Sequence, residues 1–151
     1  MQLAHYLGLL QAAQERLAEA FREVGRGHAD EADVFHMCNR LATQCDGHAE
    51  QLAPFGRRYG ESADDEPDRL HSAIFQGPRE GGLGLLRDLQ DLYLMAAECD
   101  ITWTVVGQAA QGVRDSELTR VVQTCERETA MQLQWIRSRM KEAAPQALVV
   151  A

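Results

Sequence analysis

Hydrophobic residues recur along most of this chain at alternating steps of three and four positions, the spacing that places them on one face of an α-helix. Polar residues occupy the positions between them. Helices are predicted for four segments, residues 3–24, 31–55, 85–112 and 116–143. Seven-residue patterning in four such segments predicts an all-α fold, a left-handed four-helix bundle with shallow crossing angles.

Residues near the ends of these segments support their boundaries. Gly25 and Gly27 follow the first segment and are expected to end it. Asp30 is a suitable N-cap for the second segment, and Asp115 or Ser116 for the fourth, because short polar side chains accept a hydrogen bond from the first free backbone N–H groups. Each predicted helix therefore has a chemical reason to begin or end near its stated limit.

The connections between the predicted helices differ in length. The first and third are short, so each joins two antiparallel neighbours. The second, residues 56–84, follows a helix end that Pro54 is expected to kink or terminate, and it contains an acidic run and helical turns near 70–75. This linker is long enough to return along the whole bundle, which predicts that the second and third helices are parallel. An up-down-up-down bundle with a bulky excursion is the alternative.

Composition narrows the class of protein. A chain of 151 residues suits a single domain, and a formal charge of -8 without basic stripes argues against a nucleic-acid partner. No apolar run approaches the roughly 20 residues that span a bilayer, and the amino terminus lacks the features of a secretory signal. We therefore expect a cytoplasmic protein without a membrane partner, whose four cysteines are reduced, buried thiols, namely Cys38, Cys45, Cys99 and Cys125.

Polar residues interrupt the hydrophobic faces near the middle of all four predicted helices. Counting back from the two short turns brings these positions to about the same height in the bundle, although nothing in the sequence sets the register between the two helix pairs. We expect them to converge in a central polar layer, which consists of Gln14, Cys45, His48, Cys99, Thr129 and Gln132.

This arrangement of helices and polar positions resembles the ferritin and rubrerythrin superfamily from Leu3 to about Ala144. The resemblance implies a single long crossover and a di-iron or di-manganese centre in the middle of the bundle. That family uses a Glu from the first and third helices and a Glu-x-x-His pair from the second and fourth. The positions that match here are Gln14, Cys45-x-x-His48, Ala96 or Cys99, and Thr129-x-x-Gln132.

The residues at these positions depart from the family pattern. One histidine is present and no bridging carboxylate, whereas two hard cations require several anionic oxygens. Glu98 and Glu128 lie one position off the hydrophobic faces, where we interpret them as exposed flanking residues, with an inward swing as the alternative. Ferroxidase, peroxidase or oxygenase activity of the family's kind is therefore not expected.

Three interpretations of the central polar layer remain. In the first, His48 is a buried neutral histidine that bonds Gln14 or Gln132, the thiols pack as small apolar groups, and the protein is a structural or binding protein rather than an enzyme. In the second, Cys45, His48 and Cys99 hold a zinc, copper or iron ion. In the third, Cys45 is a thiolate that His48 activates in a redox or small-molecule site.

Self-association is expected from apolar residues that the four faces do not use. The C-terminal segment 147–151 is apolar and would dock against the body or a second subunit, and Val105, Val121 and Trp135 lie outside the hydrophobic faces. The sequence therefore predicts a homodimer.

Overall fold

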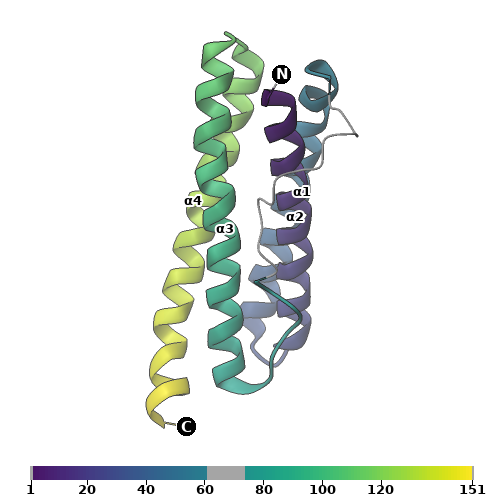
Figure 1. Ribbon diagram of the computed structural model, residues 1–151. Helices are drawn as coiled ribbons and strands as arrows, with labels where there is room; N and C mark the ends of the chain where they lie inside the picture. The colour runs from purple at the N-terminus through teal and green to yellow at the C-terminus, as the bar shows by residue number, and fades with distance from the viewer. Residues whose placement is uncertain (1, 61–73, 151) are drawn as a thin grey trace.

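The computed structural model describes residues 2–60 and 74–150. These residues form four long α-helices and a short C-terminal π-helix, without any strand in the two described ranges. The elements are α1 (Gln2–Gly27), α2 (Ala32–Arg58), α3 (Gly81–Gly112), α4 (Ser116–Pro145) and η1 (Gln146–Val150). The four helices lie side by side in one bundle (Figure 1), which confirms the predicted all-α four-helix architecture.

Contacts at the two ends of the bundle show how the chain runs. His28, in the turn between α1 and α2, contacts Asp88 near the start of α3. Arg58, the last residue of α2, contacts Asp115 in the turn between α3 and α4. The starts of α2 and α3 therefore lie at the same end of the bundle, the lower end in Figure 1.

The four helices pack as two hairpins. α1 packs closely on α2 and α3 on α4, whereas α2 approaches α4 at far fewer positions. α2 and α3 lie diagonally across the bundle, since no Cα atom in the described part of α2 comes within 8 Å of one in α3. The contact between α2 and α4 is consequently the loosest of the four adjacent helix pairs, and side chains must bridge it.

α1 continues through Gly25 to Gly27 instead of ending at residue 24 as predicted. The reason is packing, because both glycines allow a close approach. A Cβ at Gly25 would lie 3.1 Å from the Cβ of Cys38, and one at Gly27 would lie 2.5 Å from the Cβ of Pro78. Gly25 therefore admits α2 without breaking the helix, whereas Gly27 is the last residue of α1 and admits the end of the linker against it.

The N-cap expected for α2 was wrong, and so was the expectation that Pro54 could end this helix. Glu31, not Asp30, occupies the N-cap position, and its side chain makes no capping hydrogen bond. Pro54 lies inside the helix, which continues to Arg58. Proline removes one backbone donor, but Pro54 and Glu50, whose carbonyl is released, both lie on the exposed side of α2, where water can hydrate that carbonyl.

The other helix ends follow the expected signals more closely. Asp115 caps α4, since its carboxylate accepts a hydrogen bond from the backbone N–H of Leu118 at 3.0 Å. The acidic run and most of the helical turns predicted for the linker fall in residues 61–73, outside the described residues. The described part of the linker, 74–80, is not helical.

Candidate functional site

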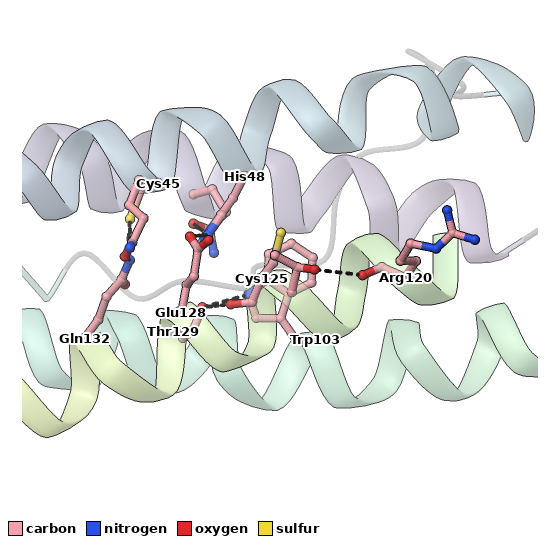
Figure 2. A network of polar contacts seen from close by, with 11 residues as sticks. Cys45, His48, Trp103, Arg120, Cys125, Glu128, Thr129 and Gln132 are labelled. Atoms are coloured by element: carbon pink, nitrogen blue, oxygen red, sulfur yellow. Dashed lines mark hydrogen bonds and ion pairs between the residues drawn. The ribbon is translucent and has the colours of Figure 1, made fainter. Parts of the chain in front are cut away.

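All six residues of the central polar layer are buried, each with 1% or less of its surface exposed. They come from all four helices and lie about halfway along the bundle. In Figure 2, His48 points from α2 toward Glu128 and Cys45 toward Gln132, while Trp103 lies next to Thr129 on the other hairpin. The structure thus brings together residues that are far apart in the sequence.

His48 is the most connected side chain of this layer. Its Nδ1 lies 3.1 Å from Oε1 of Gln14, and its Nε2 lies 2.9 Å from Oε2 of Glu128. The ring also meets the ring of Trp103 edge to face, with centroids 5.7 Å apart and an interplanar angle of 89°. Through these contacts His48, on α2, joins the other three helices.

Glu128 reaches His48 although its sequence position indicated an exposed flank. The side chain is 36% exposed, so its carboxylate bends inward from the edge of the bundle. The loose spacing between α2 and α4 leaves room for this. The contact between His48 and Glu128 could be predicted only from the register of α2 against α4. The sequence does not set this register, because the two helices belong to different hairpins and no short turn joins them.

The protonation state of His48 follows from burial and hydrogen bonding. Burial lowers the pKa of the imidazole, and the hydrogen bond and negative charge of Glu128 only partly oppose that shift. The neutral ring has one donor nitrogen and one acceptor nitrogen. Since the carboxylate of Glu128 needs a donor, Nε2 carries the proton and Nδ1 is the acceptor.

Gln14 must then supply a donor to Nδ1. Its amide nitrogen is buried and has no hydrogen-bond partner when its oxygen faces His48. A rotation of the amide by 180° brings the NH₂ group to Nδ1 and leaves the oxygen as the unsatisfied atom. An unpaired carbonyl oxygen is tolerated better than an unpaired N–H. One polar atom in the middle of the layer stays unsatisfied either way.

Cys45 and Gln132 form the second contact group of the layer. The thiol sulfur lies 3.8 Å from Oε1 and 3.6 Å from Nε2 of Gln132, and that Nε2 donates to Oε1 of Gln44 at 2.8 Å. Gln132 therefore bonds Cys45 and Gln44. Gln14 and Gln132 were both expected as partners of His48, and of these two side chains only Gln14 contacts His48.

Burial also determines the state of the thiols. It raises the pKa of Cys45 well above its ordinary value, with a smaller contribution from Cys99, and it raises the pKa of Cys99 to about 12. Both groups are protonated at neutral pH. A disulfide requires Cα atoms within about 7 Å, and those of α2 and α3 are more than 8 Å apart, so the two cysteines cannot pair without a backbone shift.

Trp103 and Thr129 complete the layer between α3 and α4. The indole Nε1–H donates to the Thr129 hydroxyl at 3.1 Å, and this hydroxyl donates to the backbone carbonyl of Cys125 at 2.8 Å. Both polar groups therefore have partners inside the protein.

Cys45 and His48, two of the residues predicted as metal ligands, do not point at each other. Cys45 and His48 lie one turn apart on α2 but face different partners on α4 (Figure 2). Within the described ranges, no group of three or more His, Cys, Asp or Glu side chains is arranged to hold a metal ion. A site formed by Cys45, His48 and Cys99 stays a prediction that would need these side chains to turn.

A second buried polar cluster lies at the lower end of the bundle, and the sequence patterns did not reveal it. Asp88 is completely buried and accepts hydrogen bonds from Nε2 of His28 at 2.8 Å, from the backbone N–H of Arg79 at 2.9 Å and from its Nη1 at 2.7 Å. Nη1 of Arg79 also lies 2.9 Å from Asp91. We call these four residues the His28 cluster. The available signal was Asp88 itself, an acidic residue on the hydrophobic face of α3.

Comparisons of this chain with protein-family models, with curated proteins and with solved structures give no match. In the part of the chain that the structure describes, no helix has both the length and the apolar character needed to cross a membrane.

Proposed function

We propose that this protein is a ferritin-like four-helix bundle without a carboxylate-bound di-metal centre, and that it is a structural or binding protein rather than an enzyme. The observation that carries the proposal is that His48 uses both ring nitrogens on Gln14 and Glu128. At the height where the resemblance would place a metal centre, side chains bond one another instead.

The ferritin-like arrangement is supported by the contacts at the bundle ends. With the starts of α2 and α3 at one end, the connection between them corresponds to the long crossover of that superfamily. A cytoplasmic homodimer is part of the proposal.

The state of the central layer supports a role without catalysis. A reactive cysteine needs solvent access and a lowered pKa, whereas Cys45 is completely buried and its pKa is raised. His48 is equally enclosed. Neither side chain can meet a substrate without a large rearrangement of the bundle.

Metal analysis tests the proposal. Protein purified without chelators is expected to carry metal far below one ion per chain, with the same low content in His48→Ala and Cys45→Ser. Its thermal midpoint should not change when EDTA is added. His36→Ala is the matched control for adventitious binding, because His36 is an exposed histidine on the same helix. Metal near one equivalent that disappears in both core variants, but not in the control, would overturn the proposal.

A second candidate is a metal-binding or redox protein with Cys45, His48 and Cys99 as its site, holding zinc, copper or iron. One observation favours it. Glu128 brings a carboxylate to 2.9 Å from His48, which adds an anionic oxygen that the six residues of the central polar layer lack. Rotation of His48 and Cys45 toward each other would place nitrogen, sulfur and oxygen ligands together. The metal analysis above distinguishes the two candidates.

A further inference from the structure

Ion pairs and hydrogen bonds connect α2 and α4 at both ends and in the middle of the bundle. Each is made by side chains, and each crosses from the first hairpin to the second. We call them the α2–α4 links: Arg139 with Asp33 and Glu31 at the lower end, His48 with Glu128 in the middle, and Arg58 with Asp115 at the upper end. They bridge the helix pair whose backbones approach each other least closely among the four adjacent pairs.

The α2–α4 links lie within reach of water. Each link joins a largely buried side chain to one that is more than a third exposed. The exposed partners are Asp33 at 54%, Glu128 at 36% and Arg58 at 42%. Water competes for the exposed partner of every link and dissolved salt screens its charge, so each link holds the two hairpins together only weakly.

The α1–α3 side of the bundle is held more firmly. α1 approaches α3 closely at more positions than α2 approaches α4. The His28 cluster adds a contact on this side, where the completely buried Asp88 of α3 binds His28 in the turn that follows α1. A buried hydrogen bond is not weakened by competing water. α1 and α3 are therefore expected to stay together when α2 and α4 separate.

We propose that the two hairpins open along the α2–α4 side, with the α1–α3 contact as the hinge, and that this opening exposes Cys45 and His48 to solvent. The backbone hydrogen bonds of an α-helix lie within the helix. Opening therefore breaks the α2–α4 links and the side-chain packing beneath them but leaves all four helices intact. Cooperative openings that are larger than a loop and smaller than the whole protein are common in proteins.

The opening provides a route by which a ligand reaches the central polar layer, because the closed bundle buries all six of its residues. This inference goes beyond the proposed function and does not rest on it. Metal content and hairpin opening are measured separately, so either result can fail without the other.

Thiol labelling tests the opening. Cys45 is completely buried, so N-ethylmaleimide can modify it only after the protein opens. Mass spectrometry measures the modification of Cys45 in the wild type at several urea concentrations below the unfolding transition. We expect Cys45 to react faster than global unfolding allows, with a weaker dependence on urea, because hairpin opening exposes less surface than unfolding does. A Cys45 reaction with the free energy and the urea dependence of global unfolding would overturn the proposal.

Two arginine variants test which side of the bundle opens. Arg139→Gln removes the lower link and should raise the rate of Cys45 modification about two- to fivefold, the range expected for the loss of one ion pair that water reaches. The effect would not be local, since Asp33 and Cys45 lie twelve positions apart on α2, roughly 18 Å along the axis. Arg137→Gln is the matched control, because Arg137 lies two positions away on α4 but donates to the hydroxyl of Tyr93 on α3, within the second hairpin.

The control variant should react at the rate of the wild type. Equal effects of the two arginine variants, including no effect of either, would show that the α2–α4 links do not hold the bundle closed and would overturn the proposal.

Discussion

His28 and His48 are both buried histidines that face a carboxylate, but their surroundings differ. At the lower end of the bundle, Asp88 is completely buried and receives donors from His28 and from two groups of Arg79. In the middle, Glu128 is 36% exposed, and the remaining partner of His48 is one amide with an unsatisfied atom. No buried side-chain N or O atom of the His28 cluster lacks a hydrogen-bond partner, whereas one atom of Gln14 beside His48 does.

The difference shows what each cluster contributes. The His28 cluster connects the α1–α2 turn, the end of the linker and the start of α3, so it determines where the linker returns to the bundle. The central polar layer bridges the loosely packed helices α2 and α4 through hydrogen bonds that are individually weak. We conclude that the first is required for the fold, whereas the second can change with smaller consequences.

The largest effect is expected at Asp88. Asp88→Ala leaves the buried Nε2 of His28 and the backbone N–H of Arg79 without their shared acceptor, and each buried donor left unpaired costs about 1–3 kcal/mol. Denaturant unfolding at neutral pH measures this loss. Asp91→Ala is the control, because the Asp91 carboxylate contacts the same arginine, Arg79, but not His28. We expect this variant to lower the free energy of unfolding by less than about 1 kcal/mol. Equal costs for the two variants would contradict the difference between the clusters.

A smaller effect is expected at His48. His48→Leu removes the partner of the buried Gln14 amide, which costs about 1–3 kcal/mol. The double variant His48→Leu with Gln14→Leu should recover part of that loss, because no buried amide is then left unpaired. A double-mutant cycle by denaturant unfolding measures the coupling. Additive costs would show that the two side chains do not depend on each other.

The pH dependence of stability sharpens the comparison further. His48 has a folded pKa below its ordinary value of 6.5, so between the two values the unfolded chain binds more protons than the folded protein. The neutral His48 therefore contributes fully to the free energy of unfolding above about pH 6.5. This contribution is lost as the pH falls toward the pKa that His48 has in the folded protein. Thermal unfolding at several pH values should show this loss in the wild type and less of it in His48→Gln.

Glu128→Gln provides the opposite test. The charge of Glu128 raises the pKa of His48 against the effect of burial. Without that charge the folded pKa falls further, and the loss of stability in acid becomes larger than in the wild type. A smaller acid loss in Glu128→Gln would contradict the assigned role of Glu128.

The bundle itself could be predicted because the hydrophobic repeat covers four long segments and the short turns fix each hairpin. The cap at Asp115 was predicted for the same local reason. Contacts between the hairpins could not be predicted, since no short turn sets the register of α2 against α4. For that reason Glu128 was interpreted as an exposed flank, although it contacts His48.

Other errors came from residues that have two physical uses. Glycine ends helices, but Gly25 allows close packing of α1 on α2. An acidic residue is expected at the surface, but Asp88 is buried because His28 and Arg79 supply its donors. In each case the residue that determines the role of the glycine or the aspartate lies on another element. The neighbouring sequence therefore does not predict that role.

The central claim is that His48 is a neutral residue held by Gln14 and Glu128, and not by a metal ion. A ¹⁵N long-range correlation spectrum of the histidine rings at pH 7 tests it most directly. The account predicts a protonated Nε2 and an unprotonated Nδ1 for His48, with resonances that EDTA does not shift. Two protonated nitrogens, or ring resonances that move when EDTA or zinc is added, would contradict it.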